Sequence, residues 1–146
     1  MAKGKNKLYK LLQVYALKLE TDIGYTQGMN FVAALILMHV PNEALACKIF
    51  QCILQKENWF KLYLPSTPLL FELSNKLMNK IQTEMPHLGK KLIDNEVALE
   101  PVIASPLLTL FSNILSFSES THILNMFILD GEEVIIDLLM NVFNKM

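Results

Sequence analysis

The chain has 146 residues, of which 52% are hydrophobic and 18% charged, and its formal net charge is −1. This length predicts one domain with its own core, and the apolar content excludes a disordered chain. With 13 basic and 14 acidic residues, the charge favours neither nucleic acid nor an anionic membrane as a partner. Every basic residue is a lysine, so the chain has no guanidinium group to offer.

Apolar residues recur at helical spacing along the first third of the chain. A stripe over 8–19 predicts the first helix, and a second is expected over 28–40. Asn42 is placed to cap a third helix that ends near Gln55, and a short aromatic connection follows at 59–63.

The same spacing continues to the C-terminus. A fourth helix is expected from a cap at Ser66, with Pro68 in its first turn, to an end near Met85 before Pro86, and a short helix is expected over 88–93. Ser105–Pro106 is expected to form the cap and first turn of a helix that runs through Leu115. The next helix is expected to be capped by Ser118 and stopped by Gly131, and a last helix is expected over 134–143. The segment 94–104 gives no clear pattern, and Pro101 predicts a break there.

No segment alternates apolar and polar residues with a period of two, so a sheet is not expected. The sequence therefore predicts an all-α globular bundle of about seven to nine helices, with residues 1–146 as one domain.

The polar residues give little sign of metal or redox chemistry. Cys47 and Cys52 lack C-x-x-C spacing and are expected to be buried small hydrophobic residues in a reducing compartment. No metal site is expected from the three histidines, His39, His87 and His122. There is no cleavable signal, and the apolar run 29–40 is too short to cross a bilayer. We therefore expect a cytoplasmic protein without direct membrane insertion.

One stretch, residues 22–30 (D-I-G-Y-T-Q-G-M-N), stands out as a loop-to-helix junction. Gly24 and Gly28 flank a polar side chain and allow unusual backbone angles or a close approach of another surface. Gln27 is expected at a helix N-terminus, where free N–H groups point outward and anions are favoured. From the residues alone, a capped helix start with a solvent-exposed glutamine stays open as the alternative.

Five residues of this stretch match the Y-x-Q-G-M-N signature of the TBC domain, namely Tyr25, Gln27, Gly28, Met29 and Asn30. The chain thereby resembles the TBC family, which consists of Rab GTPase-activating proteins. Two later segments are similar to the family's W-F-L-T-L-F-S and R-I-W-D-L-F-L…G blocks. These segments are Leu107–Ser112 and His122–Gly131, with departures from the family pattern at Pro106, His122, Leu124 and Asn125.

The resemblance implies a role for each motif residue. Gln27 would enter the site of a partner Rab GTPase and orient the attacking water, and Tyr25, Gly28, Met29 and Asn30 would shape the loop that presents it. GTP and magnesium would belong to the partner, so the chain itself needs no cofactor. The resemblance also implies a role in vesicle trafficking, peripheral to endomembranes through the Rab partner.

The family pattern also includes an arginine in an I-x-x-D-x-x-R segment that precedes the first helix. Such an arginine finger is worth ~10³ to 10⁵ in rate, and we do not expect Lys7 or Lys10 to replace it. The chain is therefore expected to be a partial domain that lacks this segment, and the family's last helices are expected to be missing as well.

Three hypotheses follow: the core of a Rab GTPase-activating domain, a Rab-binding module that does not accelerate hydrolysis, and a helical scaffold unrelated to GTPases.

Overall fold

Helices dominate the computed structural model, which describes residues 2–19 and 22–145 and has no β-strand within those ranges. In chain order the elements are α1 (Ala2–Val14), the π-helical turn η1 (Tyr15–Leu19), α2 (Met29–His39), α3 (Glu43–Gln55), the 3₁₀ helix η2 (Lys56–Leu62), α4 (Pro68–Glu84), α5 (Pro86–Asp94), α6 (Glu100–Thr109), α7 (Phe117–Asp130) and α8 (Glu132–Asn144). The prediction of an all-α fold with seven to nine helices is confirmed, since the described ranges hold eight α-helices.

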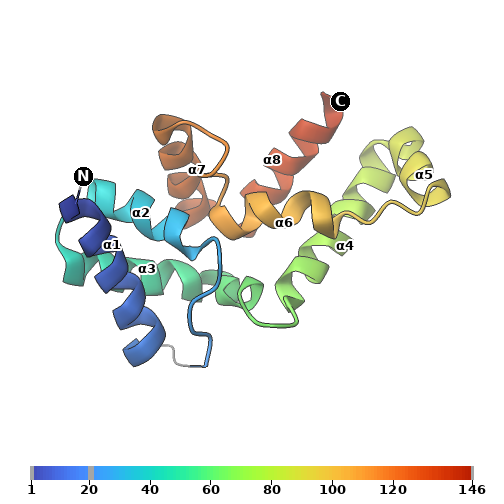
Figure 1. Ribbon diagram of the computed structural model, residues 1–146. Coiled ribbons are helices and arrows are strands. Elements are labelled where there is room, and N and C mark those ends of the chain that lie inside the picture. Colours follow the sequence, from blue (N-terminus) through green and yellow to red (C-terminus); the bar gives the residue numbers. More distant parts are fainter. Residues whose placement is uncertain (1, 20–21, 146) are drawn as a thin grey trace.

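The helices form two groups that α6 connects (Figure 1). α1, α2 and α3 pack against one another, whereas α4 packs against α5, α6 and α8. α6 contacts α2 as well as α4, and α7 contacts both α2 and α8. The segment that carries the motif therefore leads into α2 close to the point where α6 lies against it.

The aromatic connection predicted at 59–63 is part of the core. Trp59 and Tyr63 are almost wholly buried, and the ring of Trp59 lies 4.7 Å from that of Phe127 between centroids. Tyr15 and Phe50 meet edge to face at 4.9 Å. Because aromatic rings bury large apolar areas, the Trp59–Phe127 pair joins η2 to α7, and the Tyr15–Phe50 pair joins η1 to α3.

A side chain of η2 also holds the start of α8. Glu57 accepts a hydrogen bond of 2.5 Å from the backbone N–H of Glu132, the first residue of α8. Lys76 of α4 forms an ion pair with the Glu132 carboxylate. The first N–H groups of a helix have no partners inside the helix. At the start of α8, the acceptor for one of them is the Glu57 carboxylate of η2, in place of a side chain from the residue before the helix.

Two of the predicted helix boundaries are confirmed in detail. The Asn42 side chain accepts a hydrogen bond of 3.0 Å from the N–H of Leu45 and caps α3. Gly131 ends α7 with φ +80° and directly precedes α8. Glu132 and Glu133 lie in the first turn of α8, where the helix dipole favours negative charge.

The predicted caps of α4 and α7 are wrong. Ser118 lies inside α7, and the cap is Ser116, whose hydroxyl accepts from Glu119 N at 3.3 Å while the Glu119 carboxylate accepts from Ser116 N at 2.9 Å. This reciprocal S-x-x-E box satisfies two N–H groups, which Ser118 could not do. The residue before α4 is Thr67 rather than Ser66, in the left-handed region at φ +42° and without a side-chain cap bond.

The start of α6 also differs from the prediction. The helix begins at Glu100 with Pro101 in its first turn, where a missing N–H costs nothing. Pro101 therefore starts a helix instead of breaking one, and Pro106 lies inside the helix rather than in its first turn. Ser105 does not cap a helix, because it lies inside α6; its hydroxyl accepts a hydrogen bond of 3.0 Å from the amide of Asn113.

The end of α6 falls at Thr109, although a helix through Leu115 was predicted. Leu110 and Phe111 both have left-handed backbone angles, with φ of +45° and +61°, and Leu110 is the residue at which the helix ends. Both side chains are buried, so the apolar pattern continues across a point where the helix has already ended.

The two cysteines are free and occupy different environments. Cys47 is buried, and burial raises the pKa of its thiol. Cys52 is exposed, so its predicted burial is wrong, because positions five apart point to different sides of a helix. None of the helices in the described ranges is both long and apolar enough to cross a membrane.

Candidate functional site

The motif residues form a tight turn that leads into α2. The carbonyl of Thr26 accepts a hydrogen bond of 3.2 Å from Met29 N, which closes a four-residue turn with Gln27 and Gly28 at its centre. Gly28 has φ +109°, and a positive φ at the third position is the feature that gives glycine to such turns. The sequence placed Gln27 at a helix N-terminus, and it lies in the turn two residues before the start of α2.

The Gln27 side chain lies at the outside of this turn. It is exposed, and it makes no hydrogen bond to any other residue that the structure describes. Its amide can therefore both donate to and accept from a group outside the chain. The geometry leaves this side chain available to a docked partner.

Gly28 lies directly against α6. A Cβ atom at this position would stand 2.8 Å from the carbonyl oxygen and 2.9 Å from the Cβ of Leu108. Such distances are shorter than real side chains tolerate, so the close approach of the turn to α6 requires glycine. Leu108 belongs to Leu107–Ser112, the segment that resembles the family's W-F-L-T-L-F-S block.

Tyr25 and Asn30 support the turn from the two sides of Gln27. The Asn30 side-chain oxygen accepts hydrogen bonds of 3.3 Å from the Tyr25 hydroxyl and from Gly28 N. The Tyr25 ring is 54% exposed, so its contact with Asn30 is made at the surface. The structure thus brings together the residues that the sequence selected as shaping the loop.

Met29 anchors the turn in the core. Its side chain is fully buried, and its sulfur accepts a hydrogen bond of 3.4 Å from Thr26 N. The residues that flank Gln27 are therefore fixed, while the exposed Gln27 side chain makes no hydrogen bond within the described part of the chain.

Sequence reasoning did not select Thr26 or Tyr63, although both hold the turn. The Thr26 hydroxyl donates a hydrogen bond of 3.0 Å to the carbonyl of Tyr63. The Tyr63 hydroxyl in turn donates one of 2.8 Å to the carbonyl of Leu108. Thr26 is the variable position of the Y-x-Q-G signature, and Tyr63 lies 37 residues further along, so no local pattern indicated either contact.

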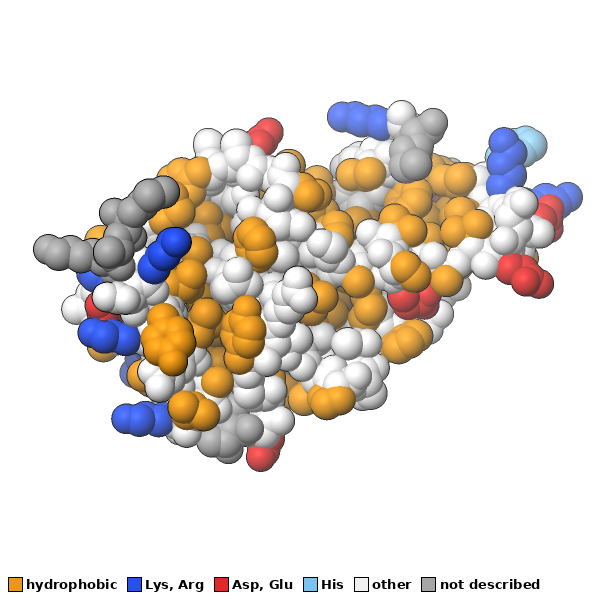
Figure 2. Space-filling model, viewed as in Figure 1, with side chains coloured by type: hydrophobic (Ala, Val, Ile, Leu, Met, Phe, Trp, Pro, Cys, Tyr) orange, Lys and Arg blue, Asp and Glu red, His pale blue; other side chains and the backbone are white. Residues whose placement is uncertain are grey.

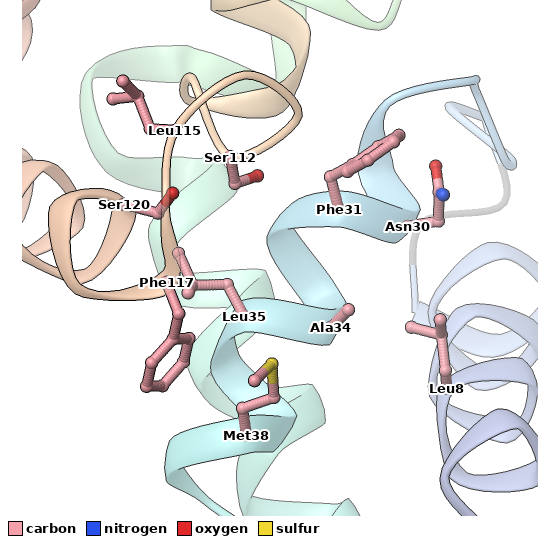
Figure 3. A pocket seen from close by; sticks show the side chains of 10 residues that line it. All are labelled: Leu8, Asn30, Phe31, Ala34, Leu35, Met38, Ser112, Leu115, Phe117 and Ser120. Carbon is pink, nitrogen blue, oxygen red and sulfur yellow. The ribbon is translucent and has the colours of Figure 1, made fainter. Parts of the chain in front are cut away.

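A groove of about 320 Å³ lies beside the motif, with α2 between α1 on one side and α7 on the other (Figure 3). Four residues at helical spacing along α2 contribute to it, namely Phe31, Ala34, Leu35 and Met38. The other lining residues are Leu8, Asn30, Ser112, Leu115, Phe117 and Ser120. Asn30 belongs to both the groove and the turn, so the groove adjoins Gln27 along the chain.

The surface around this groove is apolar. Phe31, Met38 and Phe117 are all at least 40% exposed, and the face in Figure 2 shows hydrophobic side chains gathered over α1 and α2 with charged groups mostly at the margin. Exposed apolar patches mark surfaces at which another protein, a membrane or a ligand is bound.

Lys7, one of the two lysines considered above as replacements for the arginine, is directed away from the motif. The Lys7 ammonium group donates a hydrogen bond of 2.7 Å to the carbonyl of Pro41. Pro41 follows the C-terminal end of α2, whereas Gln27 precedes its N-terminal end, and the 11 residues of α2 span about 16 Å. Lys7 therefore places its charge at the far end of α2 from Gln27.

Comparison of the chain with known proteins identifies a matching family and several relatives. A model of the Rab-GTPase-TBC domain matches residues 1–146. The chain is 27% identical over 138 residues to the GTPase-activating protein GYP5 of Saccharomyces cerevisiae, covering 94% of this chain and 15% of that protein. It is 28% identical to TBC1 domain family member 1 of Homo sapiens, covering 90% of this chain and 11% of that protein.

A similar likeness holds for the Rab GTPase-activating protein tbc-11 of Caenorhabditis elegans, which is 28% identical over 135 residues, covering 91% of this chain and 14% of that protein. The chain thus spans between 11% and 15% of the length of these three relatives.

Proposed function

This chain belongs to the Rab-GTPase-TBC domain family, and we propose that it forms the core of a GTPase-activating domain that acts on a small GTPase of the Rab family. The relatives named as GTPase-activating proteins support this proposal. The match over all 146 residues speaks against a scaffold unrelated to the family.

In the proposed mechanism Gln27 enters the nucleotide site of the partner and orients the attacking water. The carbonyl oxygen of its amide accepts a hydrogen bond from the water, and its NH₂ group donates to an oxygen of the transferring phosphoryl group. The water oxygen bonds to the γ-phosphorus while the bond between that phosphorus and the β–γ bridging oxygen breaks, which leaves GDP and phosphate. Such catalysis consists almost entirely of positioning and charge stabilisation.

The observation that carries the proposal is the position of Gln27 at the outside of an anchored turn. Its side chain is exposed and makes no hydrogen bond to the described residues. The side chain of Met29 is buried and anchors the turn in the core. The groove lined by Phe31, Met38 and Phe117 supplies adjacent apolar surface for the body of the partner.

A second candidate function is a GTPase-binding module that does not accelerate hydrolysis. The absence of arginine from all 146 residues favours it, and so does the engagement of Lys7 with Pro41 at the far end of α2. In either case, GTP and magnesium would be held by the partner. We propose a cytoplasmic location, with contact to endomembranes through that partner.

The test compares the affinity of the chain for Rab GTPases loaded with GDP alone and with GDP plus aluminium fluoride, a mimic of the transferring phosphoryl group. A catalytic glutamine is expected to favour the mimic, because such groups bind the transition state more tightly than the ground state. Gln27→Ala is expected to remove this preference and leave the affinity for the GDP form unchanged.

The matched control is Gln82→Ala, since Gln82 is an exposed glutamine near the end of α4. Equal affinity of the unaltered chain for both loaded forms, with measurable binding, would select the module that binds without activating. A lack of binding across the Rab GTPases would refute both candidates.

A further inference from the structure

Tyr63 contacts the motif turn and the helix beneath it at the same time. Its carbonyl accepts the hydrogen bond from the Thr26 hydroxyl at 3.0 Å, and its own hydroxyl donates to the Leu108 carbonyl at 2.8 Å. The residue is 2% exposed, so both bonds lie in surroundings of low dielectric, where hydrogen bonds are strong and a missing partner is costly.

The Leu108 carbonyl is free to take part because α6 ends one residue later. The last four carbonyls of a helix have no partner within it, and Ser112 N bonds to Thr109 O instead of Leu108 O. The left-handed pair Leu110 and Phe111 causes this early end. The Tyr63 hydroxyl therefore satisfies a carbonyl that the helix leaves open.

The same carbonyl sets how closely the turn approaches α6. Gly28 lies against Leu108 so tightly that a Cβ would stand 2.8 Å from the Leu108 oxygen. Gln27 lies between Thr26 and Gly28. The Thr26 hydroxyl is bonded to the carbonyl of Tyr63, and Gly28 packs against the Leu108 carbonyl, which accepts the bond from the Tyr63 hydroxyl. Two bonds of one buried residue thus fix both neighbours of Gln27.

We propose that Thr26 and Tyr63 are positioning residues, which hold the Gln27 turn in the geometry that its role requires. This inference rests on the function proposed above. Reacting groups must be held closely, since a displacement of about 1 Å can cost on the order of 10²-fold in rate. The Tyr63 hydroxyl suits the task because burial, with Tyr15 nearby, keeps its pKa far above the usual value and the group protonated.

The first experiment needs no GTPase and measures amide hydrogen exchange in four variants. Thr26→Val and Tyr63→Phe each remove one hydroxyl, and we expect the Met29 amide, which bonds to Thr26 O, to exchange about tenfold faster, as the loss of one hydrogen bond predicts. Thr26→Ser retains the hydroxyl and is expected to restore slow exchange.

The matched control is Thr83→Val, because the Thr83 hydroxyl also donates to a backbone carbonyl, that of Asn79 at 2.9 Å, but lies on α4. The amide of Leu77, fully buried in α4, reports global opening. If Met29 exchange in Thr26→Val rises no more than Leu77 exchange does, the loss is one of overall stability and the proposal is overturned.

The second experiment repeats the comparison of GDP and GDP plus aluminium fluoride. Thr26→Val and Tyr63→Phe are expected to lower the preference for the mimic by roughly tenfold or more while leaving the affinity for the GDP form within about twofold. An unchanged preference, despite faster Met29 exchange, would overturn the positioning role. If the unaltered chain shows no preference at all, the proposed activation fails, and exchange at Met29 alone decides whether the two hydroxyls hold the turn.

Discussion

The α-carbon of Gly28 packs against the backbone of Leu108, so that a Cβ on Gly28 would stand 2.8 Å from the Leu108 carbonyl oxygen. This contact joins the turn before α2 to α6, 80 residues later in the chain. It explains why the fourth residue of the Y-x-Q-G pattern is a glycine here, since both φ of +109° and the lack of space exclude a side chain.

Gly28→Ala is therefore expected to destabilise the protein by about 3 kcal/mol, from backbone strain together with the overlap with Leu108. Gly24→Ala is the matched control, because Gly24 also has positive φ, +67°, but has open space around it. Its cost is expected to be about 1–2 kcal/mol, the strain of the left-handed region alone. Urea denaturation of both variants checks this, and equal losses would contradict the role of the Leu108 contact.

Gln27→Ala is expected to change the free energy of unfolding by less than about 0.5 kcal/mol, because the side chain is exposed and makes no hydrogen bond to the described residues. Met29→Ala, two positions along, is expected to cost about 2–5 kcal/mol, since Met29 is fully buried. Thermal and chemical denaturation measure both. A large loss for Gln27→Ala would show instead that this side chain holds the junction together.

The 146-residue chain is expected to accelerate GTP hydrolysis by Rab GTPases little or not at all. It has no arginine, and an arginine finger contributes ~10³ to 10⁵ in rate. Lysine lacks the planar fork that would replace it, and Lys7 is bonded to Pro41. Single-turnover phosphate release measures the effect. Acceleration of about 10³-fold or more by this chain alone would mean that the charge is supplied in another way.

The start of α7 is expected to weaken in acid. Hydrogen bonds from Ser116, first from its side chain and then from its backbone, lower the pKa of Glu119 below its ordinary 4.5. A lowered pKa in the folded state stabilises the protein above pH 4.5, and the stabilisation is lost as the pH falls from there through the folded-state pKa.

Glu119→Gln removes this dependence, so the gap in Tm between variant and unaltered chain is expected to be larger at neutral pH than in acid. Glu72→Gln, on an exposed position of α4, controls for the loss of one negative charge. A gap for Glu119→Gln that is constant with pH would contradict the capping role of the carboxylate.

Local patterns predicted much of the fold correctly, for reasons that the helix boundaries make clear. The cap at Asn42 and the stop at Gly131 depend on side-chain and backbone chemistry within a few residues, which the sequence displays directly. The Ser116 cap was equally visible as S-x-x-E and was missed in favour of Ser118. The end of α6 was not visible, because Leu110 and Phe111 continue the apolar pattern while their backbone takes left-handed angles that a helix cannot contain.

The residues of the candidate site also divide into those that a local pattern could predict and those that it could not. The Y-x-Q-G-M-N signature selected Gln27 and its neighbours, and the structure shows them in one turn. Thr26 and Tyr63 could not be selected, since their bond joins residues 37 positions apart. Contacts of this kind depend on how helices pack, and one sequence does not encode them in any local spacing.

The short connection 56–63 has a consequence for engineering this protein. Glu57 binds the first N–H of α8, and Tyr63 binds Thr26 beside Gln27, so one segment is bonded both to α8 and to the turn before α2. A reporter peptide inserted there would detach both. The exposed residues 95–98, between α5 and α6, make neither contact and offer a place where a tag can be added while both attachments remain.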